Sequence, residues 1–192
     1  MEEEMDILSP SEALLLLAEK AKEGKVAWCE DNGGIADPPP TLIAQFSGGN
    51  GFIVPNTLDG DARDTIPVLL EMVVEQMKNL NVMPHLAWVG YICEGYSTPN
   101  NDADYAHGEM EAEYKNNPAT EIREGIIVTV YDWNGNGLAQ NILYRYDDHG
   151  MPQFSDDDVL EASLPAGTDG GVVSHLFQQF LAYCREVVAN NN

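Results

Sequence analysis

Apolar side chains recur at helical spacing in three segments of the chain. The first segment follows Ser9-Pro10-Ser11-Glu12, which suits a helix start because it combines a capping residue, a first-turn proline and a capping-box glutamate. This pattern predicts a helix that ends at Gly24. The other two patterns are broad apolar stripes, which predict a second helix opened by Asp61 or Asp64 and a last helix over residues 176–188.

Runs of β-branched and aromatic residues predict five strands. We expect them at Thr41–Phe46, Phe52–Val54, Leu86–Cys93, Gly125–Asp132 and Leu138–Tyr146. Asn134-Gly135-Asn136-Gly137 predicts a tight hairpin between the last two strands. The resulting order, α-β-β-α-β-β-β-α, lacks regular βαβ alternation. It therefore predicts one α+β domain over residues 1–192, with a mostly antiparallel sheet, three helices and a short acidic N-terminal arm.

Two acidic segments match none of these elements. Ser97–Arg123 is long for a connection inside a domain, and such loops tend to be functional or disordered. Residues 147–169 form a second predicted loop with no Lys or Arg, in which a helix start is expected near Asp157. The residues that we expect to contact a partner lie in these segments; they are Asp102, Asp104, Glu109, Glu111, Glu113, Asp156, Asp157 and Asp158.

Composition explains why acidic segments matter. The 192 residues include 9 Lys+Arg and 32 Asp+Glu, which gives a net charge of −23, while a hydrophobic fraction of 44% is typical of a folded protein. Such a charge repels phosphates, so direct binding to nucleic acid or to an anionic membrane is not expected. The same charge favours a basic protein surface as the partner.

Cysteine usage and the start of the chain predict a compartment. Cys29, Cys93 and Cys184 are widely spaced and form no CxxC motif, which indicates reduced thiols. MEEEMDIL lacks the basic and apolar regions of a signal peptide, and the longest apolar run is too short to span a bilayer. We therefore expect a cytoplasmic protein of a bacterium or a phage-infected cell.

The motifs that could carry chemistry are incomplete. The run from Asp132 to Gly137 matches the opening of a calcium loop, but position twelve is Leu143 instead of glutamate, and a hairpin explains the same residues without metal. His107 and its acidic neighbours could accept a hard cation or zinc, yet they follow no recognised ligand spacing. A nucleophile elbow and a phosphate loop are both missing from the sequence. We predict no catalytic residue, cofactor or metal, and leave enzymatic activity open.

One stretch resembles known sequences. In the run from His85 to Asn136, HLAWVGYICEGYS followed by NNPATEIREGIIVTVYDWNGNG resembles a group of small acidic proteins encoded by actinobacteria and their phages. The matching positions are Glu94, Pro118, Glu121 and Glu124, and the resemblance covers the middle third of the chain. It implies a bacterial or phage source and no catalytic residues, because the group has no assigned activity.

Three functional hypotheses remain. The favoured one is a non-enzymatic, phage-encoded interaction protein that engages a basic protein surface, with a DNA mimic or anti-host factor as its extreme form. The second is an acidic protein adapted to a salty cytoplasm, whose composition serves solubility. The third is a metal-dependent hydrolase that uses Asp102, Asp104 and His107.

Overall fold

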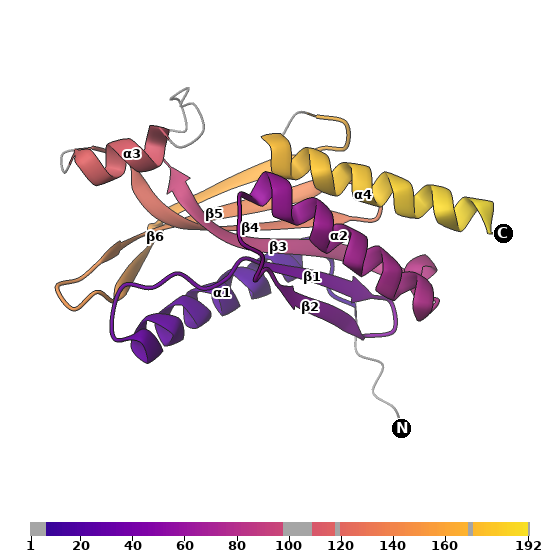
Figure 1. Cartoon of the computed structure of the whole chain (residues 1–192), viewed down its shortest axis with the longest axis horizontal. Helices are drawn as coiled ribbons and strands as arrows, with labels where there is room; N and C mark the ends of the chain where they lie inside the picture. The colour runs from indigo at the N-terminus through magenta and orange to yellow at the C-terminus, as the bar shows by residue number, and fades with distance from the viewer. Residues whose placement is uncertain (1–6, 98–108, 118–119, 169–170, 192) are drawn as a thin grey trace.

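The computed structural model describes residues 7–97, 109–117, 120–168 and 171–191. Six antiparallel strands form one sheet in the order β2-β1-β3-β4-β5-β6. Their bounds are β1 Thr41–Phe46, β2 Gly51–Pro55, β3 Leu86–Ser97, β4 Arg123–Asp132, β5 Gly137–Tyr146 and β6 Pro152–Leu164. The sheet is strongly twisted, and β2 and β6 form its two edges (Figure 1).

Helices pack on both faces of this sheet (Figure 1). Their bounds are α1 Pro10–Asn32, α2 Ala62–Asn79, α3 Glu109–Asn116 and α4 Gly171–Asn190, with a 3-10 turn, η1, at Met83–His85. α1 lies on one face, α2 and α4 lie side by side on the other, and α3 sits at the end of β3. Each face therefore has its own apolar core.

The two cores use alternate residues of the same strands. On the α2–α4 face, Phe177 stacks on Tyr131 with ring centroids 5.3 Å apart, and it also contacts Tyr91 at 5.7 Å. On the α1 face, Trp88 and Ile126 pack beneath the helix with other buried side chains. The apolar stripes and strand alternation in the sequence are thus satisfied on both sides of the sheet.

The predicted α+β class with an antiparallel sheet is confirmed, whereas the prediction of three helices is wrong. Among the described residues there are four α-helices, because α3 lies within Ser97–Arg123. α3 has no buried side chain, so its sequence carries no apolar stripe that could have predicted it. The stated order of elements is therefore also partly wrong.

The predicted loop over residues 147–169 is likewise wrong, because it contains β6. The register of β5 with β6 shifts between Ile142 and Tyr144, whose partners are Val159 and Phe154. Residues 155–158 thus lie opposite the single residue Leu143, in an irregular part of the edge strand. The strand was not predicted because consecutive aspartates in this bulge are unfavourable in a β-strand. The helix start predicted near Asp157 is also wrong, because this residue lies in β6.

Helix α1 is longer than the sequence predicted. It is capped by Ser9 and Glu12 as expected, but it continues through Gly24 to Asn32 and ends at Gly33, whose φ of 74° suits a glycine. Asp61 caps α2, in agreement with one of the two predicted starts. No helix in the described ranges is long and apolar enough to cross a membrane.

The β4–β5 turn has the predicted hairpin geometry. Asp132 Oδ1 accepts a hydrogen bond from the backbone N–H of Asn136 at 2.8 Å, and Oδ2 accepts one from the Asn136 side chain at 3.0 Å. Gly135 has a φ of 90°, which favours glycine. The carboxylate that opens the calcium-like motif therefore stabilises the turn.

Candidate functional site

A charged residue occupies the core beneath α1. Lys25 lies in the middle of the helix and its side chain is 0% exposed. Ala18 and Cys29, within two turns on the same helix face, are also buried. Lys25 thus takes a position that normally holds an apolar residue. Because a buried charge is costly unless it is paired and hydrogen-bonded, the partners of Lys25 define the site.

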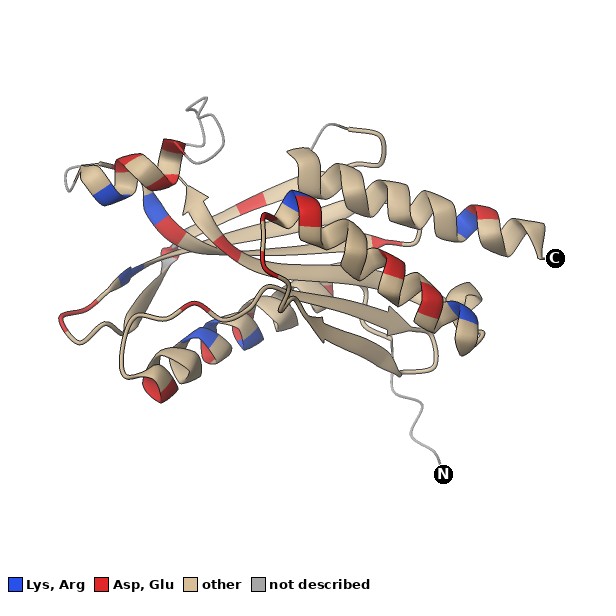
Figure 2. Cartoon of the chain, viewed as in Figure 1, with Lys and Arg blue, Asp and Glu red and all other residues tan. Residues whose placement is uncertain are grey.

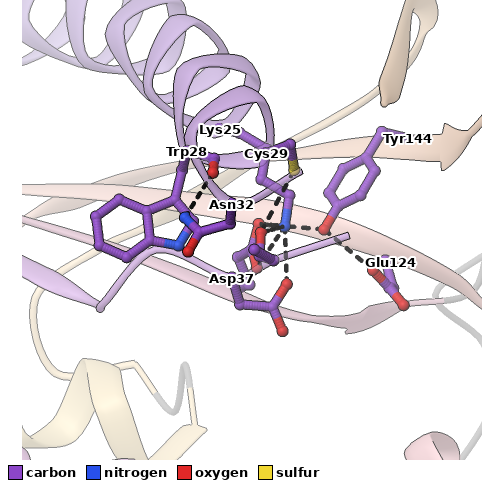
Figure 3. A network of polar contacts seen from close by, with 9 residues as sticks. Lys25, Trp28, Cys29, Asn32, Asp37, Glu124 and Tyr144 are labelled. Atoms are coloured by element: carbon purple, nitrogen blue, oxygen red, sulfur yellow. Dashed lines mark hydrogen bonds and ion pairs between the residues drawn. The ribbon is translucent and has the colours of Figure 1, made fainter. Parts of the chain in front are cut away.

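Three acceptors surround the ammonium group of Lys25 (Figure 3). Nζ donates to the carbonyl oxygen of Ala36 at 2.9 Å and to Asp37 Oδ1 at 2.8 Å, both in the loop that follows α1. It also contacts Glu94 of β3, with Oε1 at 2.7 Å and Oε2 at 2.9 Å. Each N–H of the ammonium can therefore reach an acceptor.

Two tyrosines of β5 complete the surroundings of Lys25. Tyr144 and Tyr146 project from the same face of the strand, and their ring centroids lie 5.2 Å and 5.5 Å from Nζ, within cation–π distance. The Tyr144 hydroxyl can donate to Glu94 Oε1 at 3.1 Å or to Glu124 Oε2 at 3.2 Å. Residues of α1, β3, β4 and β5 thus meet in one polar network.

The two carboxyl groups that share Lys25 shift in opposite directions. Burial, supported by a hydrogen bond with Asp37, raises the pKa of Glu94 to about 8, although Lys25 opposes the change. Burial acts to raise the pKa of Asp37, but hydrogen bonds with Glu94 and Lys25 lower it. For Lys25, burial acts to lower the pKa, and the two carboxyl partners raise it overall. Lys25 therefore stays charged, while Glu94 can exchange a proton near neutral pH.

Further carboxylates gather where β3 ends and β4 begins (Figure 2). α3 packs on the end of β3, where the Tyr96 and Tyr114 rings lie 5.2 Å apart. Burial raises the pKa of Tyr96 to about 12, and the charges of Glu124, Glu111 and Asp37 add to the rise. We call this region the acidic end; its acidic residues are Asp37, Glu94, Glu109, Glu111, Glu113 and Glu124.

An apolar groove borders the Lys25 network. It lies between α1 and the β1–β2 hairpin, has a volume of about 510 Å³, and is called the α1 groove below. Polar and charged residues also line this groove, which is otherwise apolar; they are Lys20, Lys25, Thr41, Cys93 and Glu94. Burial raises the pKa of Cys93 to about 12, so this thiol is a poor nucleophile.

The predicted contact residues fall into three groups. Glu109, Glu111 and Glu113 lie on α3 and belong to the acidic end. Asp157 lies in the bulge of β6, and the backbones of Asp156 and Asp158 lie there too. This strand is separated by β4 and β5 from β3, the strand on which α3 packs. The structure therefore places the described ones among these residues in two separate regions. Asp102, Asp104 and His107 lie outside the described residues.

Sequence reasoning missed Lys25, Asp37 and Glu94 as a unit. The available signal was the recurrence of Lys25 at helical spacing between Ala18 and Cys29, which would have placed a lysine on the buried face. This recurrence was not used, because the helix was expected to end at Gly24 and in fact continues to Asn32. Asp37 comes from an irregular loop, and its approach to Lys25 could not be read from spacing.

The chemistry open to this arrangement is recognition of cations. Within the described ranges, no group of three or more His, Cys, Asp or Glu side chains has a geometry that could hold a metal ion. Acidic side chains and tyrosine rings surround the ammonium group of Lys25, and Lys115 of α3 pairs with Glu111. No family model, curated protein or solved structure matches the chain significantly.

Proposed function

We propose that this chain is a non-enzymatic interaction protein that engages a basic surface of a partner protein through its acidic end. The observation that carries the proposal is that the chain's own Lys25 and Lys115 already bind carboxylates there. Carboxylates and tyrosine faces both attract ammonium and guanidinium groups. The same chemistry would accept lysine and arginine side chains of a partner.

The overall charge supports this proposal. Six acidic residues belong to the acidic end, in a chain of net charge −23. A surface of this sign steers basic partners toward it and repels acidic ones, with an effect that salt screens. A DNA mimic, which presents carboxylates in place of phosphates, is the extreme form of the same proposal.

The test is binding of a polar probe, a peptide of about fifteen residues in which Lys and Arg alternate with Gly and Ser. Fluorescence anisotropy of the labelled probe should show binding at low salt that weakens steeply toward about 0.3 M salt. The Glu111→Gln/Glu113→Gln variant of α3 should weaken binding about threefold to tenfold, since exposed charges contribute roughly 0.2–1 kcal/mol each.

A matched control isolates the acidic end from net charge. Glu71→Gln/Glu75→Gln removes two exposed carboxylates from α2, which lies on the other face of the sheet. This variant should bind the polar probe nearly as well as the unaltered chain. Equal losses in the two variants, or an affinity that does not depend on salt, would contradict the proposal.

A further inference from the structure

The α1 groove has an apolar surface that the chain itself leaves open. α1 packs across β3, β4, β5 and β6, so the β1–β2 hairpin extends beyond the helix on this face (Figure 1). Leu17, Ala21 and Trp28 form the helix wall of the groove, and Ile43, Ile53 and Ile92 line it from the sheet.

Two large side chains of the groove are unusually exposed. Ile53 is 74% exposed and Trp28 is 41% exposed. Complete burial of an isoleucine side chain is worth about 1.5–3 kcal/mol, so exposing one in a concave surface leaves a large apolar contribution unused. Apolar surface of this kind, bordered by charged residues, is typical of a binding site.

One end of the groove is anionic. Asp31 lies on the same face of α1 as Trp28, one turn later, and no basic residue occurs in this last turn. Lys20, two turns before Trp28, also lines the groove, but it pairs with Glu23 of the same helix. A carboxylate near the C-terminus of a helix is repelled by the negative end of the helix dipole, so its position lowers the stability of the helix. Asp37, whose side chain is 70% exposed, lies in the loop that follows. A cation bound there would offset this repulsion.

We propose that the α1 groove binds a basic, amphipathic segment of a partner protein, whose apolar side chains fill the groove and whose Lys or Arg side chains contact Asp31 and Asp37. The inference rests on the proposed function and adds the site and the kind of segment. Charge decides between occupants: a second copy of the chain, at −23, or an anionic membrane would be repelled from the acidic rim.

The test compares two tryptophan-free peptides of the same length and charge. The polar probe described above contains no large apolar residue, whereas the amphipathic probe carries Leu or Ile at every third or fourth position. We expect the amphipathic probe to bind at least about tenfold more tightly, since burial of one apolar side chain suffices for that factor. Burial of Trp28 should shift the tryptophan fluorescence to shorter wavelength, and calorimetry should show a negative heat-capacity change.

Substitutions assign the extra affinity to the groove. Ile53→Gln should weaken the amphipathic probe about tenfold and leave the polar probe unchanged, because Ile53 supplies apolar contact area only. Val68→Gln is the matched control, since Val68 of α2 is 45% exposed and lies outside the groove. Circular dichroism and the unfolding midpoint should be unchanged in both variants, as expected for exposed positions, and Ile53→Val should restore most of the binding.

The outcomes separate the two proposals. Equal affinities for the two probes, or an unchanged affinity in Ile53→Gln, would overturn the groove inference while leaving the acidic end as a cation-binding surface. Failure of both probes to bind would overturn both. If sedimentation shows that Ile53→Gln abolishes self-association and the probes do not compete with it, the occupant is a second copy of the chain and the inference is also wrong.

Discussion

Lys25 occupies a core position of α1 where burial alone would favour an uncharged side chain. Its charge is retained because Asp37 and Glu94 lie within 2.8 Å and 2.7 Å of Nζ. These contacts also join α1 to β3 and to the loop that follows the helix. A buried ion pair of this kind adds little net stability compared with an apolar pair, but loss of one partner is costly.

Lys25→Met should therefore destabilise the fold by about 1–3 kcal/mol, because it removes the cation that hydrogen-bonds to Glu94, the buried carboxyl group of the network. Urea denaturation at neutral pH measures the change. Lys20→Met is the control: Lys20 is exposed and pairs only with Glu23 of the same helix, so its loss should change stability by less than about 0.5 kcal/mol. Similar costs in both variants would show that the Lys25 network carries no special energy.

Glu94 should give the fold a distinct pH dependence. Its pKa rises from an ordinary 4.5 to about 8 in the folded chain, so between these values the folded state holds a proton that the unfolded state has lost. The contribution of Glu94 to the free energy of unfolding is therefore fully present below pH 4.5, and it declines as the pH rises to about 8. One proton corresponds to at most about 1.4 kcal/mol per pH unit.

Glu94→Gln removes this titration while keeping the shape of the side chain. The stability of the unaltered chain, relative to that of Glu94→Gln, should decline between pH 5 and 8 in urea titrations, because of the roughly one-proton difference between folded and unfolded states. A difference that stays constant or grows with pH would show that Glu94 is ionised throughout the range. The comparison cancels every group that titrates equally in both proteins.

In helix α1, the local helix propensity and the tertiary packing favour different helix ends. Gly24 weakens the helix, yet buried Lys25 and Cys29 on the next turn extend it to Asn32. Gly24→Ala should stabilise the fold by about 0.5–1 kcal/mol, because a Cβ there meets nothing within 4 Å. Gly33→Ala should instead destabilise it by about 1 kcal/mol, since Gly33 has a φ of 74°. Thermal unfolding of the two variants should give shifts of opposite sign; equal signs would contradict the assigned helix end.

The same contrast explains which elements the sequence predicted. α2 and β1 were correctly expected, because their buried residues recur with a regular period. β4 and β5 were also expected, because both are runs of β-branched and aromatic residues. α3 and β6 were missed, because α3 buries no side chain and β6 carries consecutive aspartates in its bulge. The acidic character of α3 was predicted, but the Lys25 network was not, because it joins residues far apart in the sequence through tertiary contacts.

For the whole molecule, the central fact is a net charge of −23 on a fold with two ordinary apolar cores. Self-repulsion at this charge opposes the compact state, and screening by salt relieves it. The interaction proposal and the alternative of a salt-adapted protein therefore both expect salt to stabilise the fold. They differ in the salt concentration over which the gain occurs.

If the acidic residues serve recognition of a partner, the fold needs only enough salt to screen the repulsion between them. Its unfolding midpoint in NaCl should then rise up to about 0.3 M and change little beyond, because the Debye length has already fallen below about 6 Å. A salt-adapted chain should be unstable at low salt and continue to gain stability into the molar range. Thermal unfolding in a series of NaCl and KCl concentrations distinguishes these curves, and both salts avoid the general stabilisation that sulfate produces. A steady rise to molar salt would favour adaptation over recognition as the role of the acidic surface.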